Sequence, residues 1–256
     1  MQTAQIGKHK VEIYDAIDEM PVVRFHKYQK LLLIDAGIGS DIASYDRGME
    51  KARQFLAEGK TDKAAQELEN ARLCIHFIQQ GINPKHRAFA ALVKSIDGVA
   101  CDDMSDDALE KVTKTLQDAP NNLLTALLEA VKKKIDSELM VYFPAIFNDS
   151  SVKEYYDLLK RRANEILKGI AAGVDEPDKT TVVEKLTAEL ITYSKPQSFT
   201  GSDGVEVQFD RQFEDLCLAL SEQLHVEPKK YTVLEFYNAF DFIRERAKKA
   251  KKGGKN

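Results

Sequence analysis

Apolar residues recur every three or four positions along most of the chain, and this is the period of amphipathic α-helices. Turn and capping residues punctuate the pattern at regular intervals. Together they predict helices over residues 22–36, 41–56, 61–80, 84–93, 106–116, 120–143, 151–172, 181–191, 210–224 and 232–248. The predicted fold is mainly α, a multi-helix bundle with at most a minor β-hairpin or small sheet near the N-terminal half.

Three stretches depart from the helical period. Val11 and Ile13 alternate with charged residues, so residues 10–14 are predicted to form a short strand, with residues near Asp97-Gly98 in the same sheet. Residues 31–34 form an apolar run that fits either a buried strand or a helix, and we favour the helix. Alternation over residues 205–209 allows a small hairpin across the GSDG turn at residues 201–204.

Several helix starts have recognisable capping residues. Asn83 precedes Pro84, which suits an N-cap followed by the first helical position. Ser105 precedes two aspartates, which the helix dipole favours in a first turn. Thr232 and Glu235 have the spacing of a capping box.

Residues 195–204 (KPQSFTGSDG) form the clearest break in the chain. We therefore predict a helical domain over residues 1–194, a linker or small hairpin over 195–209, a C-terminal helical pair over 210–248, and a disordered basic tail over 249–256. Residues 52–71 have the alanine and glycine spacing of one tetratricopeptide-like unit. No second copy follows at a fixed period, so a plain helical hairpin is the better interpretation.

Composition narrows the class of protein. The chain has 256 residues, of which 43% are hydrophobic and 30% charged, as in ordinary globular proteins. Three widely separated cysteines indicate a reducing compartment rather than a disulfide framework. No transmembrane run and no secretory signal is apparent, so we expect a protein of the cytoplasm.

The candidate chemical motifs all have simpler explanations. Gly37-x-Gly39 lacks the third glycine of a dinucleotide loop and fits the end of a helix. The aspartates at 102, 103, 106 and 107 do not follow the order of a calcium loop and fit helix capping. None of the five histidines has metal-ligand spacing; they are His9, His26, His76, His86 and His225. We expect no catalytic residue, no metal and no cofactor.

Interaction surfaces are the remaining candidates. The last predicted helix has aromatic residues on more than one face, so it is buried on two sides or presents one side to a partner. Burial is the default; the candidate partner-binding residues are Phe236, Tyr237, Phe240, Phe242 and Ile243.

Basic side chains form two groups. One contains Lys8, Lys10, Arg24, Lys27 and Lys30, and the other contains Arg244, Arg246, Lys248, Lys249, Lys251, Lys252 and Lys255. A solvated, solubilising tail is favoured over nucleic-acid binding, because no stacking aromatics are interleaved with these lysines. A nucleic-acid-binding regulator that uses the tail stays as an alternative, with salt-dependent binding as its expected property.

Three segments resemble proteins of the tail module of tailed bacteriophages. Residues 89–116 (FAALVKSIDGVACDDMSDDALEKVTKTL) resemble the region of tail-assembly chaperones in which an apolar segment, an acid-glycine turn and an aspartate-rich helix start follow one another. Residues 229–248 (KKYTVLEFYNAFDFIRERAK) resemble the C-terminal segment of such chaperones, and residues 11–42 resemble a structural protein of the same module. The helical middle, residues 120–193, has no counterpart in this resemblance.

The resemblance implies a non-enzymatic protein that binds the tape-measure protein during tail assembly and helps to recruit tail tube subunits. It places the protein in the cytoplasm of an infected bacterial cell. The alternative that it leaves open is a virion structural protein of the same module.

Overall fold

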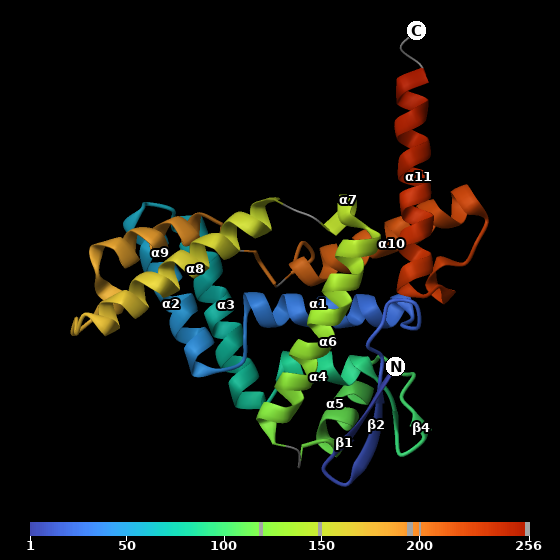
Figure 1. Cartoon of the computed structure of the whole chain (residues 1–256), viewed down its shortest axis with the longest axis horizontal. Helices are drawn as coiled ribbons and strands as arrows, with labels where there is room; N and C mark the ends of the chain where they lie inside the picture. Colours follow the sequence, from blue (N-terminus) through green and yellow to red (C-terminus); the bar gives the residue numbers. More distant parts are fainter. Residues whose placement is uncertain (118–119, 148–149, 194–196, 200, 254–256) are drawn as a thin grey trace.

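The structure is a computed structural model that describes residues 1–117, 120–147, 150–193, 197–199 and 201–253. Within these residues the chain is mainly helical, with a small sheet in the N-terminal half, as predicted (Figure 1). The longer helices are α1 (Val22–Gly37), α2 (Ile42–Ala57), α3 (Thr61–Gln80), α4 (Pro84–Leu92), α5 (Asp106–Thr115), α6 (Asn121–Tyr142), α8 (Ser150–Ala171), α9 (Thr181–Tyr193), α10 (Val205–Leu224) and α11 (Val233–Gly253). Shorter helical turns are α7 (Pro144–Phe147), η1 (Pro177–Lys179) and η2 (Pro228–Lys230).

The sheet is antiparallel throughout. Its strands, in spatial order, are β1 (Gln2–Ile6), β2 (His9–Ile13), β3 (Val93–Ile96) and β4 (Val99–Ala100). The strand predicted over residues 10–14 is β2, whose Val11 and Ile13 are buried. Asp97 and Gly98 both have positive φ, as a tight two-residue hairpin turn requires, and this turn joins β3 to β4. Strand β1 was not predicted, because most of its side chains are polar or exposed.

Helix α1 runs through the centre of the molecule (Figure 1). Its side chains at Phe25, Tyr28, Leu31 and Ile34 recur at helical spacing and are all buried in the main hydrophobic core. Residues 31–34 therefore belong to a helix, which decides between the two alternatives. The predicted helix end at Gly37-x-Gly39 is also confirmed, because α1 ends at Gly37 and the amides of Ile38 and Gly39 both donate to Ile34 O.

Most predicted helix starts are present with their capping contacts. The Asn83 side chain accepts a hydrogen bond from the His86 amide at 3.1 Å, and the Ser105 hydroxyl accepts one from the Ala108 amide at 3.3 Å. The Thr232 amide donates to Glu235 Oε2 at 2.8 Å, and the return bond of the capping box is 3.3 Å long. Helices α2 and α3 pack against each other as the predicted helical hairpin (Figure 1).

The predicted hairpin over residues 201–209 is wrong, because residues 205–209 form the first turn and a half of α10. Val205 and Phe209 are four residues apart, so the alternating pattern also fits a helix whose Val207 faces solvent. Helix α10 therefore begins five residues before the expected start at Asp210. The expected linker lies partly outside the described residues, at 195, 196 and 200.

The predicted disordered tail needs a similar correction. Helix α11 continues to Gly253, so residues 249–253 are helical. Residues 254–256 of the expected tail lie outside the described part of the chain. Figure 1 shows that the C-terminal half of α11 extends away from the rest of the molecule.

Helices α10 and α11 pack against α1 and the segment before it. The Val22 amide donates to Tyr231 O at 2.9 Å, and the amides of Val233 and Leu234 donate to Met20 O and Ile17 O at 2.9 Å each. Val233 is part of the main core. The N-terminal part of α11 is thus tied to the N-terminal half by main-chain hydrogen bonds as well as by apolar packing.

Across the described residues, no helix has the combination of length and apolarity needed to cross a bilayer.

Candidate binding pocket between α1, α6, α10 and α11

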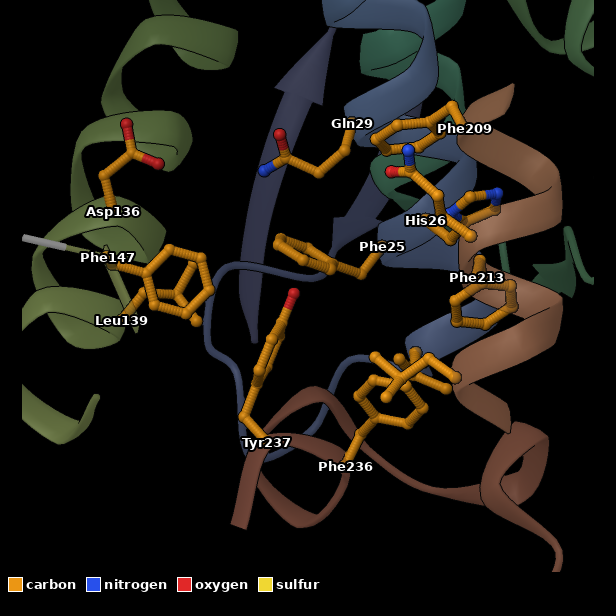
Figure 2. Close-up of a pocket in the computed structure, with 13 residues that line it drawn as sticks. Phe25, His26, Gln29, Asp136, Leu139, Phe147, Phe209, Phe213, Phe236 and Tyr237 are labelled. Carbon is orange, nitrogen blue, oxygen red and sulfur yellow. The ribbon is translucent and has the colours of Figure 1, made fainter. Parts of the chain in front are cut away.

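A pocket of about 410 Å³ opens where α1, α6, α10 and α11 meet (Figure 2). Its lining is mostly aromatic and aliphatic, and it consists of Val22, Phe25, His26, Gln29, Asp136, Leu139, Phe147, Phe209, Gln212, Phe213, Leu216, Phe236 and Tyr237. Cavities of this size and apolarity with a few polar groups are the usual form of binding sites in proteins.

Helical spacing explains how the sequence builds this lining. Residues 22, 25, 26 and 29 lie on one stripe of α1, and residues 209, 212, 213 and 216 lie on one stripe of α10. Helix α6 ends at Tyr142, and the short α7 turns Phe147 back toward the opening. The pocket therefore depends on helices that are distant in sequence.

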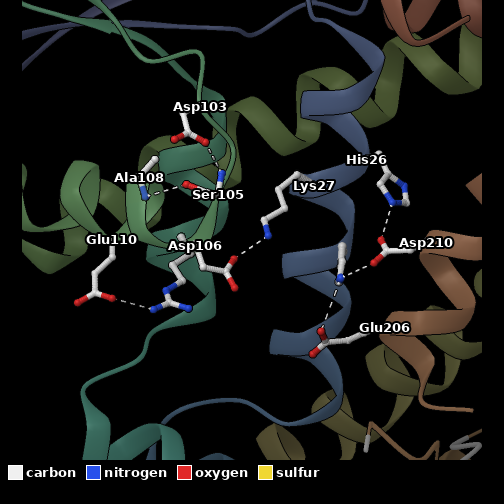
Figure 3. A network of polar contacts seen from close by, with 11 residues as sticks. His26, Lys27, Asp103, Ser105, Asp106, Ala108, Glu110, Glu206 and Asp210 are labelled. Carbon is white, nitrogen blue, oxygen red and sulfur yellow. Dashed lines mark hydrogen bonds and ion pairs between the residues drawn. The ribbon is translucent and has the colours of Figure 1, made fainter. Parts of the chain in front are cut away.

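One wall of the pocket is a stack of three rings. The imidazole of His26 lies between Phe213 and Phe209, with centroid distances of 4.2 and 4.6 Å and nearly parallel planes. Its Nε2 hydrogen-bonds Asp210 Oδ1 at 2.9 Å, and Lys30 Nζ donates to Asp210 Oδ2 at 2.7 Å (Figure 3). These contacts attach α10 to α1.

Burial between the two phenyl rings lowers the pKa of His26, an effect that the hydrogen bond with Asp210 opposes. His26 is therefore uncharged near neutral pH. Because its pKa is lower in the folded state than in the unfolded chain, its contribution to stability is present above about pH 6.5. That contribution falls as the pH drops from about 6.5 toward the folded-state pKa.

Replacing His26 with phenylalanine is expected to make the free energy of unfolding less dependent on pH between pH 7 and pH 5. The phenyl ring keeps the stack but cannot take up a proton. Urea unfolding at several pH values measures the difference between the two proteins. Burial also lowers the pKa of His86, which contributes equally to both. If the two proteins instead have parallel pH profiles, protonation of His26 does not destabilise the folded state, and the prediction is wrong.

Tyr237 forms the floor of the pocket. Its ring makes edge-to-face contacts with Phe25, Phe147 and Phe236 at centroid distances of 6.3, 5.0 and 5.6 Å. Figure 2 shows its hydroxyl pointing up into the pocket. Burial raises the pKa of Tyr237 to about 12, so the hydroxyl stays protonated and is available as a donor.

Polar groups with unused hydrogen-bonding capacity face this space. Within the described residues, neither the Tyr237 hydroxyl nor the side-chain amides of Gln29 and Gln212 have a hydrogen-bonding partner. Asp136 stands on the α6 side of the pocket, opposite Gln29 on α1 (Figure 2). The pocket thus combines apolar walls with groups that can orient a bound molecule.

The five predicted partner-binding residues have different positions. Phe236 is buried and Tyr237 partly buried, and both line the pocket. Phe240 and Ile243 are half-buried against the small cluster around Phe236 and Cys217. Phe242 is 53% exposed on α11, with the Arg246 guanidinium 5.5 Å from its ring centroid.

The pocket residues from α1 and α10 were not predicted. Phe25 and His26 lie in α1, and Phe209 and Phe213 follow in α10 more than 180 positions later, so no local pattern brings them together. Their spacing of three and four on each helix was the available signal, but the expected hairpin at 205–209 concealed it for Phe209.

Asp106 and Asp107 lie in the first turn of α5, as the sequence predicts, and Ser105 is the cap. Asp103 accepts a hydrogen bond from the Ser105 amide at 2.8 Å, and Asp106 lies 2.7 Å from Lys27 Nζ of α1 (Figure 3). No group of three or more His, Cys, Asp or Glu side chains in the described ranges is placed to hold a metal ion.

Comparisons of this chain with protein-family models, with curated proteins and with solved structures find no match. Its function is therefore inferred from the pocket and from the sequence.

Proposed function

We propose that this protein is a non-enzymatic assembly factor that holds a partner protein by admitting side chains of a partner helix into the pocket. The observation that carries the proposal is an open aromatic cavity with unpaired polar groups at its floor and rim. Amphipathic helices bind other proteins by placing apolar side chains in such cavities.

The dimensions of the pocket support this mode of binding. A space of about 410 Å³ accommodates one or two large side chains. Anchors that fill a desolvated pocket supply most of the binding energy in protein interfaces, often about 2 kcal/mol or more each. Helices α10 and α11 pack on α1, and α6 packs on α4, which itself packs on α1, so the cavity is formed before a partner arrives.

The resemblance to phage tail-assembly chaperones suggests which partner this is. Residues 229–248, which carry part of that resemblance, supply Phe236 and Tyr237 to the pocket. We therefore propose the tape-measure protein of a tailed bacteriophage as the partner. A virion structural protein of the same module is the alternative, and it differs in being retained in finished particles.

Filling the pocket is expected to abolish capture of the tape-measure protein. Gln212 is exposed at the mouth of the pocket, so a tryptophan there occupies the opening without disturbing the core. The measurement is a pull-down from infected-cell lysate with the wild type and Gln212→Trp, quantified by mass spectrometry. We expect at least a tenfold loss, which corresponds to about 1.4 kcal/mol of binding energy.

Leu218→Trp is the matched control, because Leu218 is exposed on the same helix and does not line the pocket. It should capture as much tape-measure protein as the wild type. Equal capture by wild type and Gln212→Trp would contradict binding through the pocket. Mass spectrometry of purified particles separates the two functions, because a chaperone is absent from them and a structural protein is present.

A further inference from the structure

The pocket contains a single carboxylate among aromatic rings. Asp136 is the one acidic side chain in the described lining, and no lysine or arginine belongs to that lining. His26, the other titratable group of the wall, is held uncharged by burial and faces Asp210 rather than Asp136. The pocket therefore has a net negative charge near neutral pH.

The carboxylate of Asp136 is only loosely paired. Lys132, one turn earlier on α6, approaches it at 3.7 Å, beyond hydrogen-bonding distance, and both side chains are more than one third exposed. Burial raises the pKa of Asp136, the positive charge of Lys132 partly opposes this rise, and Glu129 on the same helix adds to it. The carboxylate thus has unused capacity to accept hydrogen bonds from a cation.

We propose that the pocket selects an arginine side chain presented by the partner helix. The guanidinium would pair with Asp136, and the ammonium of Lys132, 3.7 Å from that carboxylate, is the cation it has to displace. A planar guanidinium also stacks on aromatic rings and donates two parallel hydrogen bonds to a carboxylate. This inference rests on the proposed function, and it adds the chemistry of the side chain that the pocket recognises.

The other lining groups suit the same side chain. Figure 2 shows Gln29 and Asp136 on opposite sides of the pocket, with Phe147 and Leu139 on the side of Asp136 and Phe25 and the Tyr237 hydroxyl facing them. The aliphatic stem of an arginine packs against Phe147 and Leu139, while the Gln29 amide oxygen can accept a further guanidinium N–H. A neutral aliphatic side chain would leave the Gln29 amide without a hydrogen-bonding partner and would give Asp136 no partner beyond Lys132.

Small probes test this selectivity in the full-length protein without the partner. Butylguanidinium carries the head group of arginine, and 1-pentanol is an uncharged molecule of similar length. Amide chemical shifts followed by NMR give the Kd of each probe and locate it in the protein. The wild type is expected to bind butylguanidinium about tenfold more tightly than 1-pentanol, which corresponds to about 1.4 kcal/mol.

Two substitutions on α6 should change this preference in opposite directions. Asp136→Asn is expected to remove it, whereas Lys132→Gln removes the competing cation and is expected to strengthen butylguanidinium binding severalfold without affecting 1-pentanol. A destabilised fold cannot produce the tighter butylguanidinium binding expected of Lys132→Gln. The proposal is overturned if Asp136→Asn retains the preference, if Lys132→Gln weakens binding, or if the shifts lie away from the pocket.

The same variants distinguish this inference from the proposed function. If tape-measure capture is lost in Gln212→Trp but unchanged in Asp136→Asn, the proposed recognition of arginine is overturned and the proposed assembly function still stands. Selective binding of butylguanidinium with no tape-measure capture supports the recognised chemistry and overturns the choice of partner.

Discussion

Replacing Arg24 with methionine is expected to lower the free energy of unfolding by about 3–5 kcal/mol, as breaking a buried charged contact does. Arg24 is only 4% exposed although it lies near the start of α1. In the sequence it belongs to a basic group with four lysines, and its burial could not be predicted from that grouping. Its guanidinium lies inside the protein, between α1 and the sheet.

Three main-chain carbonyls depend on this guanidinium. Its Nη1 donates to Ala91 O at 3.0 Å and to Val93 O at 2.8 Å, and its Nη2 donates to Cys101 O. The same group lies 5.2 Å from the centroid of the Tyr14 ring. Methionine fills most of the space but donates no hydrogen bond. Each buried acceptor left without a partner costs about 1–3 kcal/mol.

Chemical denaturation measures this loss, with Arg53→Met as the control. Arg53 is 74% exposed, and its ion pair with Glu50, at 3.6 Å, lies on the surface. Its replacement should therefore change stability by about 0.5 kcal/mol or less. Arg24→Lys should recover only part of the loss, because an ammonium lacks the fork that reaches all three carbonyls. Equal stability of Arg24→Met and Arg53→Met would contradict a role for Arg24 in holding the sheet to α1.

Local rules predicted the parts of this fold that depend on neighbouring residues. The caps at Asn83, Ser105 and Thr232, and the turn at Asp97-Gly98, each follow from chemistry within about four positions. Such contacts involve only neighbouring residues, so a single sequence can indicate them.

The missed features are those that tertiary contacts decide. Residues 205–209 have a strand-like alternation, but Phe209 stacks on His26 of a helix 180 positions earlier, and this contact favours a helix. Arg24 looks like a surface charge until the three carbonyls that it satisfies are known. Only part of the pocket was predicted. Phe236 and Tyr237 were candidates from the last helix, but the residues that they face come from other helices.

Replacing Phe236 with alanine is expected to lower the free energy of unfolding by about 3–5 kcal/mol, which is usual for a buried phenylalanine. Phe236 is 2% exposed and packs with Val22 of α1 and with Leu220 of α10. Its ring also contacts Phe213 at 5.8 Å between centroids. The cavity left by alanine therefore lies where α1, α10 and α11 meet.

The same variant tests the predicted division of the chain into separate domains. Main-chain hydrogen bonds connect Val233 to Met20 and Leu234 to Ile17, so the C-terminal pair shares its packing with the N-terminal half. We therefore expect one cooperative transition in the wild type and one, at lower denaturant, in Phe236→Ala. Hydrogen exchange should show α1 and α11 losing protection together.

Phe242→Ala, on the exposed face of the same helix, should leave the midpoint nearly unchanged. If the C-terminal pair alone loses protection from hydrogen exchange while α1 stays protected, residues 210–248 form an independent unit. The pocket then exists only while that unit is docked on α1.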